Sequence, residues 1–325
     1  MINSVRNTVL SILNKNNYGY ISPSDFNLFA KQAQLDLFED YFVGYNTQVN
    51  NENLRRAGTG YADMTKGLEE AIDVFSVTNA LTANELNQFF LPSAGTTGDD
   101  YYLINKCLLF SSTLDTGTTD GTSGGNNRIV DSTKDFPALG VEVGDYAAIQ
   151  ISNQVLFLRV LGLVGTTGLT VNTTGITTIG HTYSIYKKTT AQNEAEKVSN
   201  SKITMLNNSL LTAPSLQFPA YTQEGSYLYI YPDTTYNVGQ VTLQYIRYPK
   251  DPKWTYISIG AGEPVFDQSQ SDYQDFELPI EDETALVTKI LQYAGLSIRE
   301  ADVVQYARTE EMLGNMPAQP ATRTR

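Results

Sequence analysis

The stretch from Asn14 to Asp25 has nearly the spacing of a calcium-binding EF-hand loop. Gly19 stands at position 6 of such a loop, Ile21 at position 8 and the acid Asp25 at position 12. An EF-hand supplies carboxylates at several of its first positions and a bidentate Glu at its last. Here the first position is an asparagine and the fifth is Tyr18, so Asp25 is the only carboxylate in the loop. The ligand set therefore argues against calcium.

The same residues fit the start of a helix better. Ser22 is a good N-cap and Pro23 suits the first helical position. Asp25 stands where a capping box and the helix dipole favour an acid. Ile21 and Phe26 have the spacing of a hydrophobic staple, in which the residue before the cap packs on the first turn. The sequence predicts a joint between two helices here.

Enzyme chemistry has few candidate residues in this chain. The only histidine, His181, would have to act as the base for a serine or cysteine nucleophile, and nothing around it resembles a nucleophile elbow. The only cysteine, Cys107, precedes an apolar run and is typical of a small core residue. A His/Cys zinc site needs more of both residue types. We therefore expect no enzyme, no cofactor and no metal site, and we expect His181 at the surface or half-buried.

Residues 263–283 form an acidic segment, and no lysine or arginine occurs from residue 254 to residue 288. The segment contains Asp267, Asp272 and Asp275. A site for a hard cation is one interpretation, but the glycine and the D-x-D spacing of a calcium loop are missing. Carboxylates without clustered geometry are usually solvated. A solvated or pore-facing acidic strip is the favoured interpretation.

The composition describes a globular, acidic protein of 325 residues, with 41% hydrophobic residues, 18% charged residues and a net charge of −13. Residues 1–104 contain 6 basic residues (Lys and Arg) and 12 acidic residues (Asp and Glu). Residues 105–190 contain 6 of each kind, and residues 191–325 contain 10 basic and 17 acidic residues. An acidic chain is a poor candidate for binding nucleic acid through its phosphates. No apolar run of about eighteen residues predicts a membrane span. The neutral middle suggests a separate module.

Apolar periodicity predicts helices near both ends of the chain and one in the middle. The predicted helices span residues 2–14, 23–42, about 65–77, 191–209, 281–294 and 297–313.

Tyrosine is frequent in this chain, with 21 residues against 13 phenylalanines, which favours a large protein–protein interface over a substrate pocket.

Short strand-like runs separated by turn residues lie between residues 108 and 188 and predict a small all-β barrel or sandwich. Alternating runs over 225–248 predict a β-hairpin. Residues 315–325 are polar and interrupted by proline, which is typical of an extended tail. We expect an α+β fold in which 1–107 and 189–314 form a helical bundle with the hairpin, and 108–188 is inserted.

Three segments resemble a family of virion structural proteins of short-tailed Bacteroidetes phages, including crAss-like phages. They are "ILNKNNYGYISPSDFNLFAKQAQLDLFEDYF" (12–42), "YIRYPKDPKWTY" (245–256) and "DFELPIEDETALVTKILQYAGLSIREADVVQYA" (275–307). The similarity covers both flanks, about 200 residues, and leaves out 108–188, which resembles only the small barrels of many phage neck and tail proteins.

The resemblance implies a head-to-tail connector, a ring beneath the portal that is commonly twelvefold. Its partners would be copies of itself, the portal protein and further neck or tail rings, and genomic DNA would pass through without specific binding. Its place would be the neck of the virion, assembled in the host bacterial cytoplasm. Arg323 and Arg325 would contact the portal, and Asp267, Asp272 and Asp275 would line the channel. Ile21, Phe26, Leu286 and Ile290 would belong to the bundle core.

Two other interpretations remain open. A head-decoration or tail-fibre-anchoring protein would use the β module for binding capsid or fibre. A wall hydrolase would use His181 or paired carboxylates, although no paired motif is present.

Overall fold

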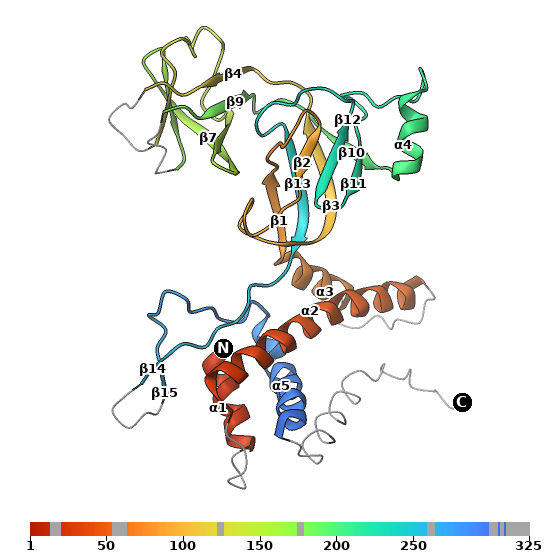
Figure 1. Ribbon diagram of the computed structural model, residues 1–325, viewed down its shortest axis with the longest axis vertical. Coiled ribbons are helices and arrows are strands. Elements are labelled where there is room, and N and C mark those ends of the chain that lie inside the picture. Colours follow the sequence, from red (N-terminus) through yellow and green to blue (C-terminus); the bar gives the residue numbers. More distant parts are fainter. Residues whose placement is uncertain are drawn as a thin grey trace, which may run out of the picture. The chain divides into compact units, whose positions relative to one another are not determined.

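The computed structural model describes residues 1–13, 21–53, 64–121, 127–173, 179–258, 264–298, 305 and 309 (Figure 1). The chain folds into two compact units. The first, here called the helical unit, joins Met1–Phe75 to Pro249–Arg325, and the second, the β unit, is Ser76–Tyr248. The chain is α+β, as predicted, and its strands lie in curled sheets.

The predicted borders at 107/108 and 188/189 do not coincide with the limits of these units. The strand β3 (Tyr101–Phe110) runs through the first border without a break. It pairs with β10 (Gln192–Lys197), which follows the second border, and this pairing draws both flanks of the predicted module into the β unit. Of the predicted helix 297–313, residues 297, 298, 305 and 309 are described and are helical, and the tail 315–325 lies outside the described residues.

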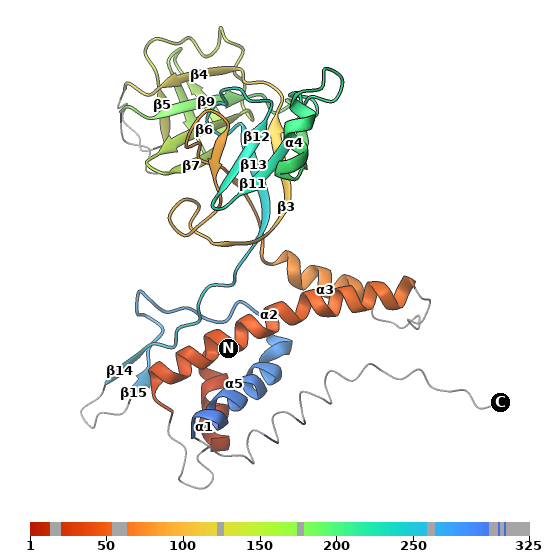
Figure 2. The same cartoon turned by 45° about the vertical axis from the view of Figure 1, so that its right-hand side comes forward.

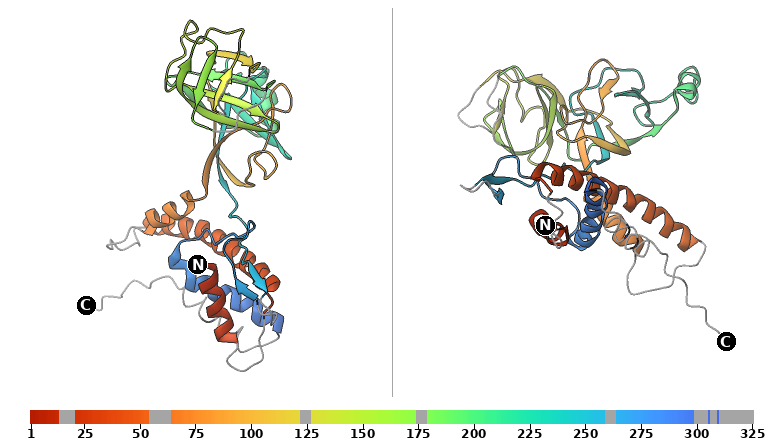
Figure 3. Two further views of the ribbon diagram at one scale, coloured as in Figure 1. Left: turned by 90° about the vertical axis from the view of Figure 1, so that its left-hand side faces the viewer. Right: turned by 60° about the horizontal axis from the view of Figure 1, so that its bottom comes forward.

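Four helices and one short turn of helix are described in the helical unit (Figure 3). They are α1 (Ile2–Leu13), α2 (Pro23–Asn53), α3 (Met64–Asp73), the 3-10 turn η2 (Ile280–Asp282) and α5 (Glu283–Ile298). α2 continues past its predicted end, because its second half packs against α3, with Gly44 facing Leu68. This tertiary contact outweighs the poor helix propensity of glycine and asparagine in that half.

The predicted start of α2 is confirmed. The Ser22 hydroxyl oxygen accepts a hydrogen bond from the Asp25 amide at 3.1 Å, and its O–H donates to the Asp25 carboxylate at 2.7 Å. The amide of Phe26 donates to the Ser22 carbonyl at 2.9 Å. Ile21 and Phe26 are both buried, as expected of a staple. Residues 14–20, which hold most of the EF-hand-like spacing, lie outside the described residues.

The core of the helical unit comes from both ends of the chain. α5 contacts both α1 and α2. Polar pairs reinforce its contact with α2: the Tyr293 hydroxyl donates to Asp36, and Lys289 lies 3.3 Å from Asp40. In the preceding turn η2, Asp282 accepts a hydrogen bond from the Tyr41 hydroxyl of α2. The buried apolar residues recur at three- and four-residue steps along α1, α2 and α5, so each of these three helices turns one stripe inward. They include Ile2, Val5 and Val9 in α1, Phe26, Ala30, Ala33 and Phe38 in α2, and Leu286, Ile290 and Ala294 in α5.

The β unit contains a seven-stranded sheet of order β1-β13-β3-β10-β11-β12-β2 (Figure 2). β10 and β11 are parallel and the other neighbours are antiparallel. Besides β3 and β10, its strands are β1 (Ser76–Ala80), β2 (Gln88–Phe90), β11 (Ala220–Glu224), β12 (Tyr227–Tyr231) and β13 (Val241–Arg247). Cys107, Leu109, Tyr221, Leu228 and Leu243 belong to its buried core.

Two sequence predictions in this sheet are wrong. The predicted hairpin 225–248 does not form, because β12 pairs with β11 and β2, and β13 pairs with β1 and β3. Residues 232–240 form a connection longer than a tight hairpin turn. The predicted helix 191–209 is helical only in α4 (Asn200–Asn207), because its first part is β10, which is held between β3 and β11 against its helix propensity.

The six-stranded sheet of the β unit has the order β4-β9-β6-β7-β8-β5 and lies within the predicted module range 108–188. The amide of Asp120, beyond one edge strand, donates to the carbonyl of Val130 in the other, which shows how far the sheet is curled. Its strands are β4 (Asp115–Thr118), β5 (Arg128–Val130), β6 (Tyr146–Ile151), β7 (Gln154–Val164), β8 (Gly168–Val171) and β9 (Thr182–Tyr186).

A small aromatic cluster joins the two sheets. Phe110 of the larger sheet stacks on Phe157 at 5.5 Å and on Tyr186 at 4.6 Å between ring centroids. The Tyr186 hydroxyl donates to the Val238 carbonyl at 2.7 Å. Ala148 completes the buried cluster. The smaller sheet is therefore packed onto the larger one and not merely tethered to it.

Candidate functional site

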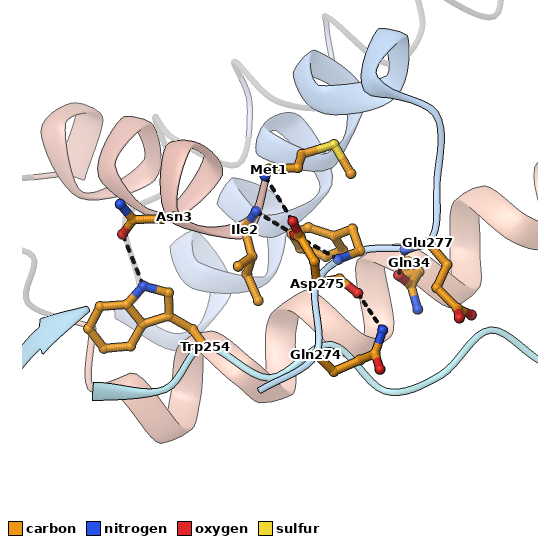
Figure 4. Close-up of polar contacts among 9 residues, drawn as sticks. Met1, Ile2, Asn3, Gln34, Trp254, Gln274, Asp275 and Glu277 are labelled. Atoms are coloured by element: carbon orange, nitrogen blue, oxygen red, sulfur yellow. Dashed lines mark hydrogen bonds and ion pairs between the residues drawn. The ribbon is translucent and has the colours of Figure 1, made fainter. Parts of the chain in front are cut away.

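The three segments that carry the family resemblance meet in the helical unit, and this meeting point is the candidate site (Figure 4). Strand β14 (Tyr256–Ser258) pairs with β15 (Pro264–Phe266), and extended chain on either side of this pair lies against α1 and α2. We call the contact the clamp. Its residues are Met1, Ile2, Asn3, Asn27, Gln34, Lys250, Trp254, Asp275 and Glu277.

Asp275 binds the first turn of α1. Its carboxylate accepts hydrogen bonds from the Met1 ammonium group at 3.0 Å and from the Ile2 amide at 2.7 Å. It also accepts one from the amide of Phe276 at 2.8 Å. An acid at a helix N-terminus satisfies amides that have no partner within the helix and interacts favourably with the helix dipole. Burial by itself raises the pKa of Asp275, but these hydrogen bonds outweigh burial and hold the pKa below its usual value.

The other two predicted channel residues lie nearby but make different contacts. Asp272 forms an ion pair with Lys253 at 2.5 Å, and this hydrogen bond lowers its pKa. Asp267 accepts hydrogen bonds from the amide and hydroxyl of Ser269 and from the side chain of Gln270, and the Ser269 hydroxyl is the main cause of its lowered pKa. The negative charges of Asp272 and Asp275 therefore face cations of the same chain, whereas Asp267 is bound by neutral groups.

Trp254 is the centre of the clamp and is 2% exposed. Its backbone is held by Asn27, whose side chain accepts from the Trp254 amide at 2.8 Å and donates to the Trp254 carbonyl at 3.2 Å. Its indole N–H donates to Asn3 at 3.1 Å, and the guanidinium of Arg6 lies 3.8 Å from the ring centroid. A cation over an aromatic face is attracted by the ring quadrupole. One tryptophan thus connects α1, α2 and the segment after β13.

The side chain of Gln34, in α2, hydrogen-bonds to two extended segments of the chain. Its side-chain N–H donates to the carbonyl of Lys250 at 2.8 Å, and its side-chain oxygen accepts from the amide of Glu277 at 3.1 Å. The Lys250 amide in turn donates to the Glu277 carboxylate at 2.8 Å. Gln34 is buried, so these bonds satisfy both ends of an amide that would be costly to bury alone. The clamp is a set of structural contacts between distant segments.

Sequence reasoning named Asp275 as a channel residue and not as a member of this site, and it did not name Trp254, Asn27 or Gln34 at all. Asn27 and Gln34 lie within a helical pattern where polar residues ordinarily face solvent, so their pattern gives no signal. A single tryptophan in a proline-limited extended segment was the available signal, because a large apolar side chain needs a buried position.

The residues weighed for catalysis belong to the β unit and not to the clamp. His181 is half-buried, and its amide donates to the Thr119 hydroxyl at 3.0 Å. Cys107 is fully buried in the core of the seven-stranded sheet, and burial raises the pKa of its thiol to about 12. No cluster of three or more histidine, cysteine, aspartate or glutamate side chains suited to a metal ion occurs among the described residues.

Other sequence features are placed as follows. The predicted portal contacts Arg323 and Arg325 lie outside the described residues. Part of the tyrosine excess belongs to the core, since five described tyrosines are buried. The buried tyrosines are Tyr183, Tyr186, Tyr221, Tyr236 and Tyr245.

Within the described ranges, no helix has the length and apolar character needed to cross a membrane.

In comparisons with known proteins, no family model matches this chain, and no curated protein matches it.

Replacing Asp275 by asparagine is expected to lower the stability of the helical unit at pH 7 by about 1 kcal/mol, because a charge-assisted helix cap is lost. The carboxylate is half-exposed, and solvent screening keeps the effect small. The folded-state pKa is depressed, so the stabilisation is present above the unfolded pKa of about 3.9 and is lost as the pH falls through the folded value. The difference in stability between the two proteins should therefore shrink as the pH falls below about 3.9, and it should vanish once the folded-state carboxylate is protonated.

Urea unfolding followed by tryptophan fluorescence measures this difference, since Trp254 is the only tryptophan and is buried in the helical unit. Asp272→Asn is the matched control, because its ion pair with Lys253 is solvent-exposed and we expect a smaller effect. An equal loss of stability for Asp275→Asn at pH 7 and pH 2 would show that the carboxylate charge has no role in the cap.

Proposed function

We propose that this chain is a virion structural protein that forms a ring in the neck of a short-tailed phage, joins the portal to the tail and lines the DNA conduit. The observation that supports it best is the clamp. Residues 12–42 and 275–307 and the end of 245–256, which carry the resemblance, pack together through Trp254, Gln34 and Glu277. A resemblance spread over distant segments has one physical basis if those segments build one unit.

In the proposed ring, the bundle built from both chain ends is the part that contacts copies of itself. α1, α2 and α5 supply its core, and the clamp fixes the extended chain that closes it. The β unit, with its curled six-stranded module, would supply contacts to the portal or to a neighbouring ring. The tail 315–325, with Arg323 and Arg325, would reach the portal, where its positive charges can bind an acidic or polar groove.

The charge of the chain suits a conduit for DNA. Each copy carries a net charge of −13, so a ring of copies repels the phosphate backbone and prevents adhesion during genome passage. Among the three proposed channel residues, Asp267 suits this role best, since neutral groups bind it and its charge is not offset. Asp272 and Asp275 would contribute less, because Lys253 and the Met1 ammonium group neutralise them.

Electron microscopy of the purified chain, alone and mixed with portal protein, tests the proposal. We expect closed rings of this chain seated on the portal. The variant Arg323→Ser/Arg325→Ser should still form rings and should bind the portal at least ~10-fold more weakly, the loss expected from removing hydrogen-bonded charge contacts.

Monomers in both samples would contradict the proposal. Binding to capsid or to fibre, without rings on the portal, would favour a head-decoration or tail-fibre-anchoring protein instead.

A further inference from the structure

The chain between α4 and β11 exposes large apolar side chains to an unusual degree. Met205 is 75% exposed, Leu210 104%, Leu211 96% and Phe218 78%. Single exposed leucines are ordinary, but monomeric proteins rarely expose several large apolar residues together. We call residues 204–219 the apolar arm. Figures 1 and 2 show α4 and the chain after it at the edge of the β unit, at the end away from the six-stranded module.

Backbone hydrogen bonds hold the arm in a defined conformation with these side chains exposed. After α4, the amide of Ala213 donates to the carbonyl of Ser209 at 3.1 Å, and the amide of Phe218 donates to the carbonyl of Ser215 at 3.0 Å. The side chain of Asn193 in β10 donates to the carbonyl of Leu216 at 2.7 Å and anchors the arm to the sheet. The leucines are therefore presented outward by an ordered segment with its own turns.

The charge pattern indicates which partner fits. From Ile203 to Gln223 the sequence has no Asp, Glu, Lys, Arg or His. Each copy of the chain carries a net charge of −13, so two copies repel one another unless their contact surfaces lack charge. The apolar arm meets this condition. Residues 105–190, which contain the six-stranded module, carry no net charge, because their six basic and six acidic residues cancel, so a contact on this module adds no net repulsion.

The six-stranded module carries a matching apolar surface. Leu161 projects from the outer face of β7 and is 53% exposed. Leu163 follows an irregularity in the pairing of β7 and lies opposite the buried Leu169, so it belongs to the other face. Val143, 56% exposed, precedes Gly144, whose amide donates to the carbonyl of Val160 beside Leu161. The surface formed by Val143 and Leu161 is here called the β7 surface. The exposed Arg159 lies on the same face of β7, two residues before Leu161, and its positive charge is attracted to an acidic chain. The apolar arm and the β7 surface are thus two different surfaces at opposite ends of one unit, and neither adds negative charge to the contact.

We propose that the apolar arm of one copy docks on the β7 surface of a second copy. A contact between two different surfaces is head-to-tail, and repetition of such a contact closes a ring when the rotation between copies permits it. The inference rests on the proposed function for ring closure, and it names the surfaces that would join neighbouring copies in the β unit.

Disulfide trapping tests the pairing of these surfaces. The native thiol of Cys107 is buried and has a raised pKa, so only introduced cysteines should react. The double variant Leu211→Cys/Leu161→Cys should give a ladder of covalent oligomers after mild oxidation, because every copy carries one cysteine on the apolar arm and one on the β7 surface. Each single variant should remain monomeric on a denaturing gel. Leu211→Cys/Leu86→Cys is the matched control, since Leu86 is 55% exposed and lies outside the β7 surface, and it should give no ladder.

Dimers from Leu211→Cys alone would show that two arms meet each other, and this result, like a ladder in the Leu86 control, would overturn the proposal. In a second experiment, Leu210→Ser/Leu211→Ser should weaken association at least ~100-fold in sedimentation, because two fully exposed leucines no longer become buried. Its melting temperature should not change. Rings that form equally well with this variant would contradict the arm contact and leave the proposed ring intact, whereas a wild-type chain that never associates would contradict both.

Discussion

Replacing Trp254 by alanine is expected to destabilise the helical unit by about 4 kcal/mol, the loss typical of deleting a large, fully buried aromatic side chain. Trp254 is 2% exposed and contacts three different segments. Its removal leaves a cavity between α1, α2 and the extended chain, and it removes the hydrogen bond to Asn3 and the aromatic face over which Arg6 lies. Arg6 is itself buried, so the loss of a contact to its charge adds to the cost of the cavity.

Hydrogen exchange measured by mass spectrometry is suited to this experiment, because it reports on each unit separately and does not need the deleted tryptophan. Amides of α1 and α2 should exchange roughly 900-fold faster, the factor that corresponds to the expected loss of about 4 kcal/mol, while strands of the β unit keep their protection. Tyr256→Ala is the matched control. Tyr256 stacks on the same indole ring at 5.6 Å but is 46% exposed, so its removal should cost much less. Equal effects of the two substitutions would show that Trp254 is not the centre of the clamp.

The clamp also shows where sequence reasoning succeeds. The start of α2 was predictable because a cap, a capping acid and a staple lie within six residues, so short-range rules determine it. The buried positions Phe26, Leu286 and Ile290 were predictable for the same reason, since the period of a helix reveals its apolar face. In each case the deciding contacts lie within one or two turns of the residue concerned.

The failures concern partners that are distant in the sequence. Alternation in β12 and β13 identifies two strands, but it does not say which strands they pair with, and the long connection 232–240 removes the preference for a hairpin. Glu and Ala in β10 favour a helix, yet pairing on both sides of that strand decides otherwise. In the candidate site, the contact of Asp275 with Met1 was not predicted, because it depends on two residues 274 positions apart; its channel role stays a prediction.

A second substitution tests how firmly the two sheets of the β unit are joined. Gly239 has a φ of +73°, which disfavours any residue with a side chain, and a Cβ at this position would lie 2.2 Å from the Cβ of Ala148. Ala148 belongs to the small cluster in which Phe110 and Tyr186 join the sheets. Backbone strain of about 1–2 kcal/mol and overpacking of about 1–3 kcal/mol should together make Gly239→Ala cost about 3–4 kcal/mol.

Two further variants separate the causes. Gly165→Ala has the same kind of backbone, with φ of +63° and no atom within 4 Å of the added methyl group, so it should cost only the strain, about 1 kcal/mol. Adding Ala148→Gly to Gly239→Ala removes the clash, so the double variant should be more stable than the sum of the two single losses predicts. Exchange rates of β6 and β13 amides measure all of these variants.

If Gly239→Ala costs no more than Gly165→Ala, the connection 232–240 can move away from Ala148 without loss, and the sheets are not held together at this point. The proposed head-to-tail contact depends on the opposite result. An arm on one sheet and an acceptor surface on the other can define a fixed rotation between copies only if both belong to one rigid body, and a closed ring requires that rotation to be the same at every contact. A costly Gly239→Ala that Ala148→Gly rescues would therefore supply the rigidity that ring closure needs.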